Sequence, residues 1–215
     1  SGPVPDDYRM GPGDQMVLVL VGEVQLAHEL EVNREGFIVI PNVGQVFVAN
    51  LTMAEMRALL RTRLARSYSG IERGTTNLSV SVARLRTNQI YVTGEVAQPG
   101  AYQLSSVATA TNALYAAGGP TSLASLRGVR VQRRNGDVRS LDLYPYLLAG
   151  DVSGDVMLEQ GDVVFVPLKG RRVQLHGAIV RPAYYELGAL EDLIDVLQAA
   201  GGFAPEALRQ RLTIH

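Results

Sequence analysis

Short apolar stretches, separated by turn residues, dominate the first third of the chain. Residues 16–21 and 37–40 are almost entirely apolar and predict two buried strands, and residues 43–48 predict a third. Residues 78–85 alternate between apolar and polar side chains, which is typical of a strand with one buried face. This part of the chain therefore predicts a small sheet.

One helix is predicted between the third and fourth of these strands. Thr52 and Glu55 have the spacing of a capping box, in which the side chain of each residue accepts a hydrogen bond from the backbone N–H group of the other. The apolar residues that follow recur every three or four positions: Met53, Met56, Leu60 and Leu64. A helix that packs on a sheet makes residues 7–86 an α+β domain.

Residues 94–119 and 177–202 form an internal repeat. They align without a gap at a constant offset of 83 positions. Nine residues of the first copy are identical to their counterparts: Gly94, Pro99, Tyr102, Leu104, Leu114, Ala116, Ala117, Gly118 and Gly119. Chance rarely keeps one register for so long, so the repeat indicates a duplicated structural unit.

Each copy predicts a strand, a turn, a second strand and a helix. An apolar run ends at Gly94 or Gly177, and a turn at Pro99 or Pro182 leads into a run that contains tyrosine. About ten helix-compatible residues then end in Ala-Ala-Gly-Gly, where a glycine just beyond the helix can adopt the left-handed conformation.

The chain after the first copy predicts three further strands. Asn135-Gly136 lies between residues 129–134 and 137–143 and is a strong hairpin signal. The turn Glu159-Gln160-Gly161-Asp162 leads into residues 163–166, which end at Pro167. A first repeat domain of mixed sheet and one helix is thus expected over residues 87–169.

The second repeat domain, residues 170–215, is expected to be incomplete. At the same offset residues 212–214 match residues 129–131, and the hairpin return and closing strand have no counterpart. We therefore expect the sequence to be a piece of a longer protein. Its fold class is α+β, with one N-terminal domain followed by two tandem repeat domains.

Composition excludes several classes of protein. The chain has 215 residues, 47% of them hydrophobic, which is enough to bury a core. A formal net charge of −1 gives no field that would attract nucleic acid. The absence of cysteine excludes thiol nucleophiles, disulfides and thiolate metal sites. The apolar run 16–21 is too short to span a bilayer as a helix.

Candidate chemistry is sparse. The histidines His28, His176 and His215 have no metal-ligand spacing, and we find no phosphate loop, serine elbow or carboxylate pair. We therefore expect no catalytic residue, no metal and no cofactor.

Three aspartates follow glycine and predict turns instead of catalysis. Asp14, Asp151 and Asp162 stand where a carboxylate can accept hydrogen bonds from nearby backbone N–H groups. The segment Gly11-Pro12-Gly13 precedes a strand and lacks a third glycine, so it reads as a turn and not as a phosphate cradle.

Five arginines gather around the Asn135-Gly136 hairpin: Arg127, Arg130, Arg133, Arg134 and Arg139. The favoured interpretation is a solvated hairpin face. The alternative is contact with an acidic polymer or with a neighbouring subunit.

Several motifs together resemble the outer-membrane polysaccharide export family. Residues 8–14 (YRMGPGD) before an apolar strand, and residues 34–44 (REGFIVIPNVG) before the helix, resemble the opening domain of that family. The repeat and residues 161–167 (GDVVFVP) resemble its soluble-ligand-binding β-grasp (SLBB) domain. The motif residues are Gly11, Gly13, Asp14, Pro41, Gly44, Gly94, Pro99, Gly118, Gly119, Gly161, Asp162, Gly177, Pro182, Gly201 and Gly202.

This resemblance implies a role in transport and not in catalysis. It implies a periplasmic protein, lipid-anchored to the outer membrane at full length, whose identical subunits form a ring, often of eight. Capsular polysaccharide or exopolysaccharide would pass through the ring, which would dock on an inner-membrane polysaccharide co-polymerase. The resemblance places a loop at residues 23–35. The alternatives are a monomeric periplasmic module that binds a glycan or small ligand, and a polysaccharide-cleaving enzyme, for which the sequence supplies no acid/base pair.

The glycines after the repeat helices give a first prediction. Gly118→Val or Gly201→Val is expected to lower the melting temperature by several degrees, because a β-branched residue tolerates the left-handed conformation poorly. Thermal unfolding of each variant measures this. An unchanged melting temperature would contradict the predicted helix ends.

Overall fold

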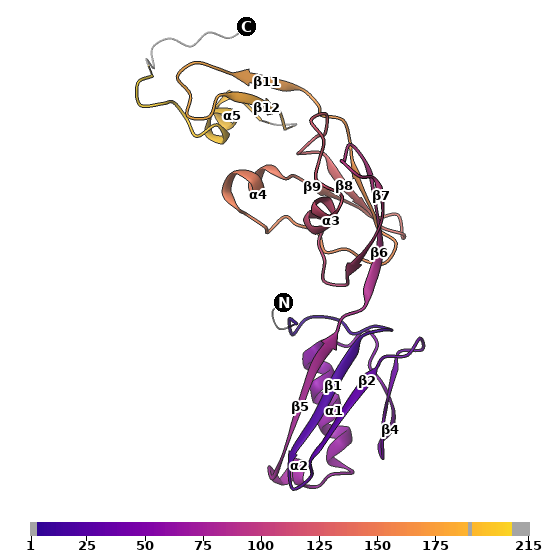
Figure 1. The fold of residues 1–215 in the computed structure, drawn as a ribbon. Helices are drawn as coiled ribbons and strands as arrows, with labels where there is room; N and C mark the ends of the chain where they lie inside the picture. Colours follow the sequence, from indigo (N-terminus) through magenta and orange to yellow (C-terminus); the bar gives the residue numbers. More distant parts are fainter. Residues whose placement is uncertain (1–3, 189–190, 208–215) are drawn as a thin grey trace. The chain divides into compact units, whose positions relative to one another are not determined.

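The computed structural model of the chain describes residues 4–188 and 191–207 (Figure 1). It separates into two compact units, one extending to Thr87 and the other beginning at Asn88. Both helices and strands occur in each unit, so the fold class is α+β as predicted.

The first unit is a small sheet covered by a helix. Its main sheet has the order β2-β1-β5, and both pairs are antiparallel. The elements are β1 (Gln15–Gly22), β2 (Leu26–Glu31), the hairpin β3 (Phe37–Ile40) and β4 (Gly44–Phe47), α1 (Met53–Ala65), α2 (Gly70–Arg73) and β5 (Thr76–Arg84).

The prediction of a loop at residues 23–35 is wrong, because residues 26–31 form the edge strand β2. Only Leu30 of this strand is fully buried, so the periodic apolar signal of a strand is weak there. The exposed positions include Glu29 and Glu31, and charged side chains are common on edge strands because they discourage further pairing.

The core of the first unit lies between α1 and the sheet (Figure 1). The predicted helix face is confirmed, since Met53, Met56, Leu60 and Leu64 are all buried. So is the predicted capping box: the Thr52 hydroxyl accepts a hydrogen bond from the Glu55 N–H at 3.2 Å, and the Glu55 carboxylate accepts one from the Thr52 N–H at 2.8 Å. The inward residues of β1, Met16, Leu18 and Leu20, complete this core.

The second unit begins with a five-stranded mixed sheet of order β7-β6-β10-β8-β9. The closing strand β10 runs parallel to β6 and antiparallel to β8. The elements are β6 (Thr87–Gly94), β7 (Gly100–Ser105), α3 (Ala110–Ala116), β8 (Val129–Gln132), β9 (Val138–Leu141), α4 (Tyr144–Ala149) and β10 (Val163–Val166). The helix α4 was not predicted, since it has six residues and none of them is buried.

The rest of the second unit contains β11 (Arg172–Leu175), β12 (Ala183–Glu186) and α5 (Leu193–Ala199). The two strands pair antiparallel, with Val173 opposite Tyr185. Residues 212–214, predicted to match residues 129–131, lie outside the described residues.

The sequence repeat corresponds to a repeat of individual hydrogen bonds. The Tyr102 hydroxyl donates to the Gln98 carbonyl at 2.5 Å, and the Tyr185 hydroxyl donates to the Arg181 carbonyl at 2.7 Å. Both tyrosines thereby close the turn that holds the shared proline. The left-handed glycines are confirmed as well, with a φ of 78° at Gly118 and 81° at its counterpart 83 positions later.

Gly94 and Gly177 occupy the same place in the two copies but have different surroundings. Their φ angles are 89° and 91°. A Cβ atom on Gly94 would lie 2.1 Å from the backbone oxygen of Val166, whereas one on Gly177 would meet no atom within 4 Å.

This pair gives the second prediction. Gly177→Ala is expected to cost about 1–2 kcal/mol of unfolding free energy, from backbone conformation alone. Gly94→Ala is expected to cost at least twice as much, because it also pushes β10 away from β6. Urea unfolding of the two variants measures the difference, and equal losses would contradict the close approach.

Candidate functional site

Two buried aspartates close turns of the same design in different units. Asp14 and Asp162 are 0% and 1% exposed. Each carboxylate accepts a hydrogen bond at 2.8 Å from the N–H group three residues before it, on Gly11 and on Glu159. The turn chemistry predicted for these aspartates is therefore confirmed. Asp151 behaves likewise, since its carboxylate accepts a hydrogen bond from the Ser153 N–H at 2.8 Å.

Each of the two buried aspartates also forms an ion pair with an arginine, and neither pairing was predicted from the sequence. Arg86 lies 2.7 Å from Asp14, and Arg133 lies 3.0 Å from Asp162. Burial raises the pKa of Asp162, and the Glu159 N–H group and the Arg133 charge offset this only in part. Both carboxylates are buried and accept hydrogen bonds from their own domain, which is the behaviour of structural groups that close turns.

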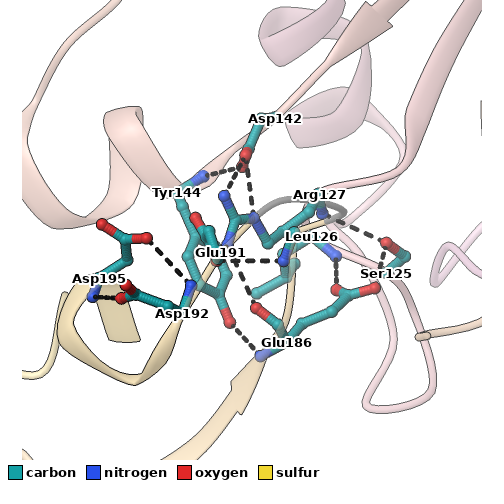
Figure 2. A network of polar contacts seen from close by, with 10 residues as sticks. Ser125, Leu126, Arg127, Asp142, Tyr144, Glu186, Glu191, Asp192 and Asp195 are labelled. Carbon is teal, nitrogen blue, oxygen red and sulfur yellow. Dashed lines mark hydrogen bonds and ion pairs between the residues drawn. The ribbon is translucent and has the colours of Figure 1, made fainter. Parts of the chain in front are cut away.

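A polar network of the second unit joins the two copies of the repeat (Figure 2). The first copy contributes the loop before β8 and the segment between β9 and α4. The second contributes the end of β12 and the turn before α5. Figure 2 shows side chains from both copies pointing into one cluster.

Glu186 is the centre of one half of this network. It ends β12 and is 8% exposed. Its carboxylate accepts hydrogen bonds from the Ser125 hydroxyl at 2.7 Å, the Leu126 N–H at 3.0 Å and the Gly170 N–H at 2.9 Å. Two of these three donors belong to the first copy, so this carboxylate ties the copies together without a cation.

Arg127 is the centre of the other half. Its guanidinium donates to Asp142 at 2.9 Å, to Glu191, and to the backbone oxygen of Glu186 at 3.3 Å. It also lies over the Tyr144 ring, 4.6 Å from the centroid. Burial disfavours its charged form, but the hydrogen bonds to Glu191 and Asp142 outweigh burial and raise the pKa of Arg127.

The partners of Arg127 are themselves held in place. The hydrogen bond from Arg127 lowers the pKa of Glu191, against the effect of burial. A carboxylate with a lowered pKa stabilises the folded state above its unfolded pKa, and this contribution is lost as pH falls through the folded pKa. Burial raises the pKa of Tyr144, whose hydroxyl accepts a hydrogen bond from the Glu186 N–H at 2.8 Å.

Comparison with known proteins explains why such a junction exists. Residues 2–83 match the family described as "Polysaccharide biosynthesis/export protein", and residues 88–166 and 172–215 each match the SLBB domain. The chain belongs to the polysaccharide export family. The network of Figure 2 is thus the junction between two successive SLBB domains.

Two named relatives align with most of the chain. The polysialic acid transport protein KpsD of Escherichia coli is 28% identical over 209 residues, which are 97% of this chain and 36% of the relative. The EPS I polysaccharide export outer membrane protein EpsA of Ralstonia solanacearum is 31% identical over 226 residues, covering 92% of this chain and 58% of the relative. The chain therefore spans about a third of the first and somewhat over half of the second.

The structure divides the five arginines of the first SLBB domain into two groups. The prediction of a solvated face is wrong for Arg127 and Arg133. Their side chains are 16% and 15% exposed and are paired with carboxylates. The other three lie on the surface: Arg130 over the Phe165 ring, Arg139 paired with Asp137, and Arg134 beside Gly161.

The remaining motif residues of the export and SLBB domains lie in turns or at the ends of strands and helices. Those with left-handed φ angles are Gly13, Gly44, Gly94, Gly118, Gly119, Gly161, Gly177, Gly201 and Gly202. Pro41 lies in the β3–β4 turn, and Pro99 and Pro182 lie before β7 and β12. Gly11 donates to Asp14 as described above. These residues do not gather into one site.

No metal site emerges in the part of the chain that the structure describes. Within residues 4–188 and 191–207, no three His, Cys, Asp or Glu side chains are grouped to hold an ion. His28 lies on β2 and His176 follows β11, while His215 lies outside the described residues. Among the same residues, no helix is both long enough and apolar enough to cross a membrane.

The junction gives the third prediction. Arg127→Gln is expected to cost about 2–3 kcal/mol of unfolding free energy, because it leaves Asp142 and Glu191 without their cation while both remain partly solvated. Hydrogen exchange should also accelerate at the Leu126 and Glu186 amides, which span the junction.

The matched control is Arg139→Gln in the same domain. Its pair with Asp137 is exposed, so the expected cost is under about 1 kcal/mol. Urea unfolding and amide exchange measure both variants. Equal costs, or unchanged exchange at the junction in Arg127→Gln, would contradict the assigned role.

Proposed function

We propose that this chain is the periplasmic part of an outer-membrane polysaccharide export protein, a ring-forming subunit through which capsular polysaccharide or exopolysaccharide passes. The observation that carries the proposal is the ordered series of one export domain and two SLBB domains along nearly the whole chain. The named relatives are a polysialic acid transport protein and a polysaccharide export outer membrane protein.

We place the export domain at residues 7–86 and the SLBB domains at residues 87–169 and 170–215. The three domains act as a scaffold in this proposal, and none of them performs catalysis.

The chemistry of the buried groups supports a scaffold. Asp14, Asp162 and Glu186 are buried, and each accepts hydrogen bonds from groups within the protein. A general acid or base needs access to a substrate proton, which such carboxylates lack. A conduit instead needs domains whose positions are fixed, and the Arg127 junction supplies this between the SLBB domains.

The partners follow from the same proposal. Identical subunits contact one another head to tail in a closed ring, for which eight members is the expectation. The ring docks on an inner-membrane polysaccharide co-polymerase and joins the outer membrane through other parts of the full-length protein. Arg130, Arg134 and Arg139 lie on the surface, where they could contact the polymer or the next subunit.

A second candidate function rests on one hollow in the first SLBB domain. A cavity of about 340 Å³ lies between α3, the loop 119–122 and α4, and its walls are mostly apolar. Tyr115 and Tyr146 stand at its edge with their hydroxyl oxygens 2.9 Å apart. This hollow could hold a small ligand, which supports the alternative function of a monomeric periplasmic module that binds a glycan or small ligand.

Electron microscopy of the full-length protein, extracted from membranes in detergent, gives the fourth prediction. Closed rings with a central lumen are expected, and they give the number of subunits directly. Monomers or dimers without a lumen would contradict the conduit and favour the ligand-binding module.

A further inference from the structure

The export domain leaves one face of its main sheet uncovered. Residues directly opposite one another in a sheet lie on the same side of it. Val17 is opposite both Glu29 on β2 and Ser81 on β5, and Val19 is opposite Ser79. These residues are half-buried or exposed, while the alternate residues of β1 are buried beneath α1. The valines thus form an apolar strip along the middle of an open face, which continues to Val21, 55% exposed.

The edge of this open face carries acidic groups without a cationic partner. Glu29 has no ion pair within the described residues, and Glu31 contacts only the side-chain amide of Gln15, at 3.3 Å. Both are exposed. Two other acidic residues of the domain are paired internally, Asp6 with Arg57 and Glu23 with Arg73.

The opposite layer carries basic groups that lack an acidic partner. Arg61, Arg63 and Arg66 lie at the C-terminal end of α1 and are exposed. None of the three has an ion pair or side-chain hydrogen bond among residues 4–188 and 191–207. The exposed face of α1 also carries small side chains, including Ala58.

We propose that the open face of the β2-β1-β5 sheet in one subunit docks on the outer side of α1 in a second copy of this chain. The valine strip would then be covered by a helix, as the other face of the same sheet already is. Glu29 and Glu31 would meet Arg61 and Arg66 of the neighbouring copy. The inference rests on the proposed function, since it names the subunit contact of the ring.

The two arginines lie on either flank of the exposed face of α1, because five residues along a helix correspond to a rotation of about 140° and a rise of about 7.5 Å. The carboxylates of Glu29 and Glu31 lie on one side of β2, about 7 Å apart. The two surfaces belong to opposite layers of one domain. Each copy can therefore use both at once, which gives a head-to-tail series, and such a series forms a ring when the rotation between neighbours closes.

A disulfide experiment tests the contact in the full-length protein, because the chain itself has no cysteine. Ala58→Cys lies on the outer side of α1, and Ser79→Cys lies on the open face of the sheet. The two positions point away from each other within one copy, so a disulfide between them must join two copies. The double variant is expected to give a ladder of linked subunits under mild oxidation, and each single variant at most dimers.

Charge reversal provides an independent test with its own rescue. Glu29→Arg with Glu31→Arg, or Arg61→Glu with Arg66→Glu, is expected to reduce the ring fraction about tenfold at low salt. Mixing the two variants should restore association, since each then supplies the charge that the other has lost. Glu72→Arg and Arg34→Glu are exposed controls in the same domain and should leave the rings intact.

The outcomes separate this inference from the proposed function. Rings in the unmodified protein without a disulfide ladder would overturn the contact and leave the conduit standing. Loss of rings in the arginine variant that mixing does not restore would mean that these arginines bind another partner, such as an anionic polymer, and would also overturn it. Absence of rings in the unmodified protein would overturn both.

Discussion

A buried carboxylate that must be satisfied holds each part of this chain together. Removing a charge from water costs several kcal/mol unless hydrogen bonds or an opposite charge replace the lost hydration. Asp14 is satisfied by the N-terminal turn and by Arg86, so it ties the two ends of the export domain together. Asp162 ties the turn before β10 to Arg133, and Glu186 ties the second SLBB domain to the first. Each carboxylate has its full set of donors only when its segments are correctly assembled.

Periodic apolar residues made most of the fold predictable. The strands at residues 37–40 and 163–166 and the buried face of α1 follow directly from local patterns. β2 and α4 escaped prediction because only one residue of β2 and none of α4 is buried, so neither has a strong apolar period. The aspartates on their turns were predictable because Gly-Asp is a local signal. The partners of those aspartates were not, since Arg86 is 72 residues from Asp14 and no pattern links them.

The SLBB junction shows how two copies of one unit have diverged. Both copies keep the tyrosine hydrogen bond and the left-handed glycines, because these stabilise each domain internally. At the junction, Glu186 and Glu191 correspond to Gln103 and Ala108 of the first copy. The carboxylates that join the domains therefore occur in only one copy. This asymmetry gives the pair a defined order, in which the second copy docks on the first.

The parallel pairing of β6 with β10 has a consequence for how the chain acquires its structure. Tyr91 pairs with Val163, so 72 residues must be synthesised and gathered before the middle of this sheet is complete. Contacts between residues so far apart in sequence slow folding, because the entropy of closing the loop is lost before the pairing stabilises it. Until β10 arrives, one edge of β6 is an unpaired strand to which other chains can add. Folding of the first SLBB domain therefore competes with aggregation until β10 pairs with β6.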